Sequence, residues 1–329
     1  MIIRNGELDM DSKNEISTSI VPFLLLFLGA IIYGSFFSAQ ILALDLGVTP
    51  LGLAFWQGFL GALILIIFSL ILREPPKFSW DHIRLYSSIS LFAFSIPLIA
   101  LSFAAPHVPP GILALILTLI PSLTYLFSFL AKLEKFNWLS TTGLAFGLAG
   151  VLIIVFRDTI MALIAGESNI LSTSSVDGSF SGTWFIIALI APLGYAASNV
   201  AVALMRPAEA TTIQLSTGVL TFSIPILVVP MLLVDGFYFF ENTDYRAFSA
   251  VLWAGITNIV IFVTLFEVVF RRGPVFFSQF NYITPAAALL WAYLIFSANV
   301  PPVVWVAIAL MAIGLYLANR GTAANLQQK

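Results

Sequence analysis

The sequence predicts an all-α polytopic membrane protein with ten transmembrane helices in two inverted five-helix repeats. Three observations lead to this fold class. The 329 residues are 60% hydrophobic and only 9% charged, and the mean hydropathy is +1.02. The apolar residues form continuous runs long enough to cross a bilayer, and one polar stretch separates them into two groups of five. A water-soluble domain is excluded, because such domains carry roughly a quarter charged residues.

The expected spans follow from the length of the apolar runs, since a bilayer core requires about 20 apolar residues per helix. Charged residues, Pro and Gly mark the breaks, as in residues 73–77 and 271–274. The runs are continuous, whereas strands of a membrane barrel would alternate apolar and polar residues. The ten expected spans are residues 20–43, 49–72, 82–105, 109–131, 138–157, 182–204, 212–234, 247–271, 274–297 and 301–320.

These spans define the domain organisation. Residues 1–19 and 321–329 are expected to be tails, residues 20–157 and 182–320 the two repeats, and residues 158–181 the external loop between them. The first 19 residues lack the basic region and cleavage site of a secretory signal, so the first span is expected to remain as an uncleaved anchor.

The distribution of Lys and Arg predicts the orientation. Twelve lie on the side of the N-terminus, the even-numbered loops and the C-terminus, and two, Arg157 and Arg246, lie on the other side. Both termini are therefore expected in the cytoplasm, with the chain in the cell (inner or plasma) membrane. We call the side with twelve Lys and Arg the basic side.

Composition also limits the partners. The net charge of −2 and the absence of a basic cluster argue against nucleic acid. The chain has no cysteine, which excludes disulfides and cysteine-ligated metals. No cofactor and no metal are expected, and the expected partners are membrane lipid and a small-molecule substrate.

Internal similarity supports a repeat. Residues of special backbone chemistry align between the halves at an offset of 164 positions, and a tyrosine near the start of each half aligns at a slightly different offset. The pairs are Pro110 with Pro274, Pro121 with Pro285, Gly150 with Gly314, and Tyr33 with Tyr195. An odd number of spans per half inverts the second copy, which is an architecture of secondary transporters.

Several motifs carry a family resemblance. Residues 28–39 (LGAIIYGSFFSA) resemble the first-span signature of the EamA-type branch of the drug/metabolite transporter superfamily. Residues 120–123 (IPSL), 133–135 (LEK) and the glycines at 143, 147 and 150 resemble its fourth-to-fifth-span signature, and residues 282–285 (YITP) and 314–316 (GLY) repeat it. The resemblance implies ten helices in two inverted halves, cytoplasmic termini, export or exchange of small metabolites, and a cavity formed mainly by helices 1, 3, 4, 6, 8 and 9.

Polar side chains at bilayer depth are the candidate substrate-binding residues, since such groups usually face the bundle interior or water. They form stripes at helical spacing on the first, sixth and ninth spans, with one further residue on the eighth. The alternative is that they are hydrogen-bonding contacts between helices. The candidates are Tyr33, Gln40, Tyr195, Asn199, Asn258, Ser278, Asn281 and Tyr282.

Three residues are candidates for coupling or gating. Glu267 is the only acid inside an expected span, and an intramembrane carboxylate can carry protons or pair with a cation. The alternative is an ion pair with Arg271, because Glu followed by Arg four residues later is a favourable order on a helix. Pro121 and Pro285 occupy equivalent repeat positions and could form a paired hinge, although membrane helices also simply tolerate proline.

The predicted function is a secondary transporter that moves a small zwitterionic, amine-like or weakly charged metabolite, similar to an amino acid, by alternating access, as an exporter or exchanger. No Lys or Arg lies deep in a span to neutralise an anion. An intramembrane enzyme, a channel and a transporter of anionic metabolites stay open as alternatives. Glycines at 143, 147, 150 and 314 could pack within the bundle or in a homodimer.

Overall fold

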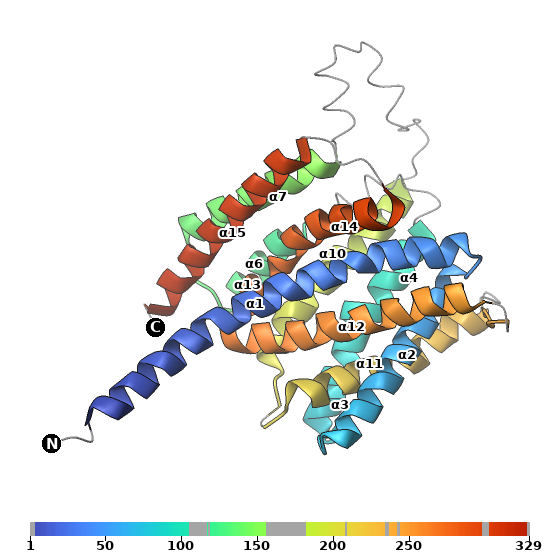
Figure 1. Ribbon diagram of the computed structural model, residues 1–329, viewed down its shortest axis with the longest axis horizontal. Coiled ribbons are helices and arrows are strands. Elements are labelled where there is room, and N and C mark those ends of the chain that lie inside the picture. Colours follow the sequence, from blue (N-terminus) through green and yellow to red (C-terminus); the bar gives the residue numbers. More distant parts are fainter. Residues whose placement is uncertain are drawn as a thin grey trace, which may run out of the picture.

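A computed structural model shows the chain as a bundle of long helices, in which the start of the first helix and the end of the last reach the same side (Figure 1). All regular secondary structure in the described part of the chain is helical. The expected loop 158–181 and Pro110 lie outside the described residues. The structure describes residues 4–104, 117, 119–155, 182–207, 209–233, 237–241, 244–297 and 303–327.

The described helices of the first half overlap the expected spans, although of the fourth span, 109–131, the structure describes only residue 117 and residues 119–131. They are α1 (Arg4–Asp45), α2 (Pro50–Ile71), α3 (Trp80–Ile89), the π-helical turn η1 (Ser90–Ser95), α4 (Ile96–Ala104), α6 (Ile120–Leu130) and α7 (Trp138–Val155). The start of α2 shows how local sequence sets a boundary. Thr49 accepts a hydrogen bond from the Gly52 N–H at 3.1 Å, and Pro50 follows at the first helical position, where its missing N–H costs nothing.

The helices of the second half are α10 (Gly182–Leu204), α11 (Thr212–Leu233), α12 (Tyr245–Arg272), α13 (Pro274–Ser278), α14 (Phe280–Phe296) and α15 (Val303–Gln327). Gly273 ends α12 with a φ of 87°, a backbone conformation that favours glycine, and Pro274 then starts α13. The ninth expected span is thus two helices, separated at Gln279.

Two helices extend beyond the expected spans. α1 begins at Arg4, inside the expected polar tail 1–19, and α15 continues to Gln327 within the expected tail 321–329. Hydropathy marks where a helix leaves the apolar core of a bilayer, whereas the backbone hydrogen bonds of the helix continue until a cap or a breaking residue ends them.

The third expected span is a continuous helical segment, α3 to α4, with the π-helical turn η1 in its middle. The Ile96 N–H donates to Leu91 O, five residues back, and Pro97 follows directly with no N–H to donate. α10 packs closely against this widened turn at Gly194. The absence of a side chain there permits the contact, since a Cβ on Gly194 would lie 2.6 Å from Phe92 O. The π-helical turn therefore positions α4 and accepts the close approach of α10.

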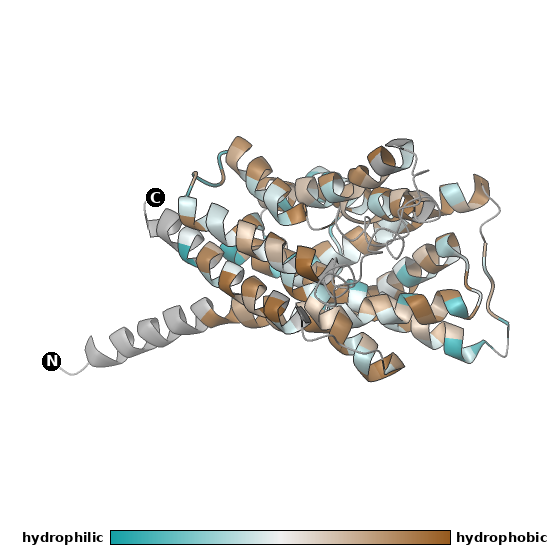
Figure 2. Ribbon diagram, turned by 90° about the horizontal axis from the view of Figure 1, so that it is seen from above, coloured by the Kyte–Doolittle hydropathy of each residue, from teal (hydrophilic) through white to brown (hydrophobic). Residues whose placement is uncertain are grey.

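Six of the described helical segments are long and apolar enough to cross a membrane. Apolar residues dominate the helices, and hydrophilic residues lie mainly near helix ends and in connections (Figure 2). Helices α6 and α15 contribute shorter apolar segments, Ile120–Leu130 and Ile308–Ala318. The chain is therefore a multi-pass helical membrane protein.

Contacts between the two halves follow a reciprocal pattern. α1 of the first half packs on α12 and α14 of the second, while α10 of the second half packs on α4 and α6 of the first. α2 packs on α12, and α11 packs on α3. α2 also contacts α11, and α7 contacts α15 along much of their length (Figure 1).

Glycine allows the close contact of α7 with α15. A Cβ on Gly143 would lie 2.4 Å from Ala318 N, and one on Gly314 would lie 2.6 Å from Gly147 N. Both are backbone atoms that cannot move aside as a flexible side chain would. Gly143, Gly147 and Gly314 therefore pack within the bundle. The alternative, in which they would form a contact between protomers, does not apply to these three residues.

We expect Gly143→Ala to destabilise the protein. Overpacking against backbone costs about 1–3 kcal/mol, which exceeds the gain of about 1 kcal/mol in helix propensity. Thermal unfolding of the purified protein in detergent measures the effect. Gly58→Ala is the matched control, because its nearest neighbours would be side-chain atoms: the Phe94 ring edge at 3.2 Å, the Ser223 hydroxyl at 3.4 Å and Leu227 Cδ1 at 3.6 Å. Equal unfolding temperatures for the two variants would contradict the backbone contact.

Candidate functional site

The two tyrosines that the sequence aligned lie near each other across the halves. Tyr33 lies on α1 and Tyr195 on α10, both are half-buried, and their hydroxyls are close enough to interact electrostatically. The Tyr33 ring stacks on Phe36, with centroids 4.9 Å apart, and lies 5.6 Å from the Phe280 ring of α14. The structure thus brings together the two tyrosines that the sequence aligned.

Two other candidates are also only partly buried. Gln40 lies two helical turns after Tyr33 on α1, toward the side opposite the basic side. Asn281, near the start of α14, donates from Nδ2 to Ser278 O at 3.1 Å. These side chains keep exposed surface, so they can contact a solute.

Three buried candidates make hydrogen bonds between helices instead. Asn199 Nδ2 donates to Thr124 Oγ1 at 3.2 Å and joins α10 to α6. Asn258 Nδ2 donates to Gln57 Oε1 at 3.2 Å and joins α12 to α2. The Tyr282 hydroxyl donates to Leu144 O at 3.0 Å and joins α14 to α7. In this conformation all three act as interhelical contacts, and their role in lining a cavity stays a prediction.

The remaining candidate, Ser278, is buried and donates to Val275 O of its own helix at 2.7 Å. Its neighbour Gln279 is a residue that the stripe pattern missed. Gln279 is fully buried at the break between α13 and α14, and neither its Nε2 nor its Oε1 has a partner among the described residues. Gln57 Nε2 is likewise buried without a described partner. A buried unpaired amide is costly, so both are positions where water or a solute would be stabilised.

The proline pair occupies different helical positions. Pro285 lies inside α14, whereas Pro121 is the second residue of α6. At that position a proline removes no hydrogen bond within the described helix, because the first N–H groups of a helix have no partner there. Of these two prolines, only Pro285 lies inside a described helix, and the paired hinge stays a prediction.

A polar pocket lies on the basic side, between the start of α11 and the end of α12. Its volume is about 370 Å³, and its lining residues are Arg206, Ala210, Thr211, Thr212, Glu267, Phe270 and Arg271. The Arg206 guanidinium lies 4.0 Å from the centroid of the Phe270 ring, a cation–π contact. The pocket therefore combines cationic, anionic and hydroxyl groups near one helix end.

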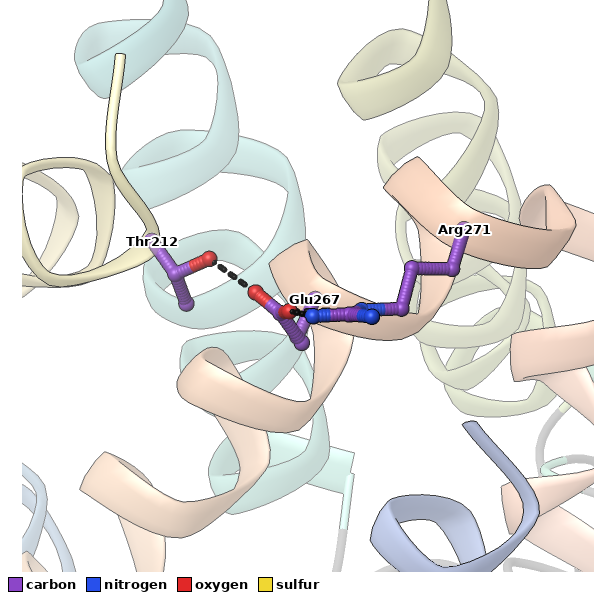
Figure 3. A network of polar contacts seen from close by, with 3 residues as sticks. All are labelled: Thr212, Glu267 and Arg271. Carbon is purple, nitrogen blue, oxygen red and sulfur yellow. Dashed lines mark hydrogen bonds and ion pairs between the residues drawn. The ribbon is translucent and has the colours of Figure 1, made fainter. Parts of the chain in front are cut away.

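Glu267 is held from two sides in this pocket (Figure 3). Its Oε2 accepts from the Thr212 hydroxyl at 2.5 Å, and its Oε1 accepts from Arg271 Nε at 2.6 Å and from Arg271 Nη2. The predicted pair with Arg271 is therefore present. The adjacent Thr211 donates its hydroxyl to Glu74 Oε2 at 2.8 Å, which connects the start of α11 to the segment after α2. These bonds form a network across the two halves, which we call the Glu267 network.

The described helices, the six apolar segments and the reciprocal packing define the class of multi-pass helical membrane proteins. Residues 21–156 match the model of the EamA-like transporter family. This match covers the first of the two expected repeats and supports the resemblance to the EamA-type branch of the drug/metabolite transporter superfamily.

Other comparisons address the fold. One crystal structure of a protein superposes with a TM-score of 0.69 at 17% sequence identity, covering 94% of this chain and 99% of the other. At this identity the likeness shows a shared fold. A search of curated protein sequences found no significant match.

We expect Thr212→Val to lower the free energy of unfolding by about 1–2 kcal/mol, because it removes a hydrogen bond to a charged group while keeping the side chain's shape. Thermal unfolding in detergent gives the value. Thr142→Val is the matched control, since that exposed hydroxyl donates only to Trp138 O of its own helix, at 2.8 Å. In a Glu267→Ala background the Thr212→Val change should have little effect, and an undiminished effect would show that the hydroxyl acts elsewhere.

Proposed function

We propose that this chain is a secondary transporter of a small zwitterionic, amine-like or weakly charged metabolite, similar to an amino acid. It works by alternating access in the cell membrane, as an exporter or exchanger, with both termini in the cytoplasm. The observation that carries the proposal is the position of two half-buried tyrosines where the halves meet. Tyr33 lies 5.6 Å from the Phe280 ring of α14, and Tyr195 lies on α10, which packs on α4 and α6. Secondary transporters bind substrate at such a contact between repeats.

The reciprocal helix contacts support two inverted five-helix repeats. If α10 to α15 repeat α1 to α7 in order, exchanging the halves turns the contacts of α1 with α12 and α14 into those of α10 with α4 and α6. The contact of α2 with α11 and the contact of α7 with α15 each join two equivalent helices, so exchanging the halves leaves both contacts unchanged. A two-fold relation between the halves accounts for this pattern, and rocking of one half against the other then opens the site alternately to each side.

The chemistry of the central residues supports the cargo class. Tyrosine rings and carboxamides offer hydrogen bonds and cation–π contacts but no fixed positive charge. The described Lys and Arg lie outside the expected spans or near their ends, as with Arg271 and Arg320. A multiply charged anion would therefore reach the Tyr33 and Tyr195 region without a countercharge.

One observation favours an anionic metabolite instead. The basic-side pocket holds two guanidinium groups and one carboxylate, and Glu267 pairs with only one of them, Arg271. Arg206 could then attract an anionic solute to the entrance. This alternative is separated from the main proposal by the choice of solutes in the transport assay.

Any homodimer would use a surface other than the contact of α7 with α15, because Gly143, Gly147 and Gly314 face each other inside the chain. An intramembrane enzyme has little support. In the described ranges no three His, Cys, Asp or Glu residues lie close enough to hold a metal ion, and the matched family is one of transporters.

We expect Tyr195→Ala to lower solute counterflow at least tenfold, because it removes a ring and a hydroxyl from the contact between the halves. Purified protein in liposomes is tested with labelled amino acids, quaternary amines and sugar phosphates. Tyr293→Ala is the matched control, since Tyr293 lies exposed on α14, and should keep normal counterflow. Movement of sugar phosphates alone would overturn the proposed cargo class.

For Glu267 we propose a gating role, in which the carboxylate holds the basic side closed through the Glu267 network. Glu267→Gln should then change the rate of counterflow but keep any dependence on a proton gradient. The same liposomes, with and without an imposed pH difference, provide the measurement. A gradient dependence that disappears in Glu267→Gln would instead make this carboxylate the coupling site.

A further inference from the structure

A short motif, Lys-Phe-x-Trp, occurs twice on the basic side. Residues 77–80 read Lys-Phe-Ser-Trp and residues 135–138 read Lys-Phe-Asn-Trp. Each copy ends on the first residue of a helix, Trp80 for α3 and Trp138 for α7. The two helices start on the same expected side of the membrane, after the second and fourth spans. We call the two copies the KFxW segments.

The third residue of each KFxW segment is used inside the chain. Asn137 Oδ1 accepts from the N–H groups of Leu139 at 2.8 Å and Ser140 at 3.3 Å, and so caps α7. The Ser79 hydroxyl hydrogen-bonds His82 Nδ1 at 2.7 Å at the start of α3. Local hydrogen bonds of the third residue therefore fix the conformation of both segments.

The aromatic residues of the segments point outward. Phe78 and Trp80 are 65% and 75% exposed, and Phe136 and Trp138 are 53% and 76% exposed. Trp80 and Trp138 are the most exposed of the described tryptophans. The Phe136 and Trp138 rings already meet edge to face, with centroids 5.1 Å apart. These four rings form apolar surface that the protein's own described core does not cover.

Positive charge accompanies both aromatic pairs. The exposed Lys77 lies near Arg73 and Arg84 in the sequence, against two acids, Glu74 and Asp81, which leaves one net positive charge. The exposed Lys135 lies near Lys132, against Glu134, and the balance is again one positive charge. Glu74 is in addition bonded to Thr211.

An anionic lipid headgroup fits this combination. Trp rings favour the headgroup level of a bilayer, where an apolar ring and a polar N–H are both accommodated. Lys and Arg near a membrane surface attract anionic lipids. A lysine followed by two exposed aromatic residues presents both features at one level, and both copies lie at helix starts, which are expected at the membrane boundary.

We propose that each KFxW segment binds the phosphate of an anionic phospholipid in the leaflet on the basic side. The lysine meets the phosphate, and the Phe and Trp rings lie between the headgroup and the first part of the acyl chains. The two sites fix the depth of α3 in the first half and the depth of α7, the partner of α15. This inference is independent of the cargo and of the transport cycle.

Thermal unfolding with added lipid tests the proposal. In neutral detergent, phosphatidylglycerol should raise the unfolding temperature of the wild-type protein, whereas phosphatidylcholine should not. The rise should be lost in Lys77→Gln/Lys135→Gln and kept in Arg246→Gln, a change of an exposed basic residue at the start of α12 on the opposite side. A double variant that keeps the full rise, or a rise with phosphatidylcholine alone, would overturn the proposal.

Two further measurements separate the lipid from other causes. Inorganic phosphate should give no rise, and an equal rise would mean a small-anion site in place of a lipid site. Native mass spectrometry should show up to two fewer bound phosphatidylglycerol molecules on Trp80→Ala/Trp138→Ala than on Trp305→Ala. Trp305 is 66% exposed on α15 but follows Pro, Val and Val in place of a Lys-Phe pair. Equal lipid counts for these two variants would contradict the proposal.

Discussion

A polar side chain inside this bundle must find a partner within the chain, because neither lipid tails nor neighbouring apolar side chains offer a hydrogen bond. Many buried hydroxyls meet this requirement within their own helix, as Ser278 does with Val275 O, whereas the buried asparagines join helices, Asn199 with Thr124 and Asn258 with Gln57. The same requirement makes Gln279 informative, because its buried amide has no partner among the described residues. Interhelical bonds thus fix the arrangement, and an unpaired amide indicates where something from outside can bind.

Apolar packing and polar bonds both hold the described helices together. Among the described residues, one extensive apolar cluster reaches the basic side, where Phe266, Phe276 and Phe280 pack with Tyr86 and Leu215. A smaller cluster around Val251 and Leu53 lies toward the opposite side. The Glu267 network adds polar bonds at the basic side. On the basic side, the described helices are thus held by both apolar packing and polar bonds between the halves.

Some features could be predicted from the sequence because they depend on nearby residues. Glu267 and Arg271 are one helical turn apart, so their pairing follows from helix geometry alone. The spans follow from apolar runs of sufficient length. By contrast, Asn258 finds its partner 201 positions away in Gln57, and no local pattern indicates that contact. The alternative between lining and interhelical bonding could not be decided from a stripe of polar residues, because both uses place them on the same helix face.

The sequence by itself determined the helical membrane class, the family resemblance that the match over residues 21–156 supports, and the Glu267–Arg271 pair. Length, hydropathy and helical spacing are sufficient for these. Only the tertiary structure decided that Gly143 and Gly314 face each other, that α13 and α14 separate at Gln279, and that Tyr33 and Tyr195 approach across the halves. These features depend on how helices distant in sequence pack, and packing is set by the shapes of both surfaces together.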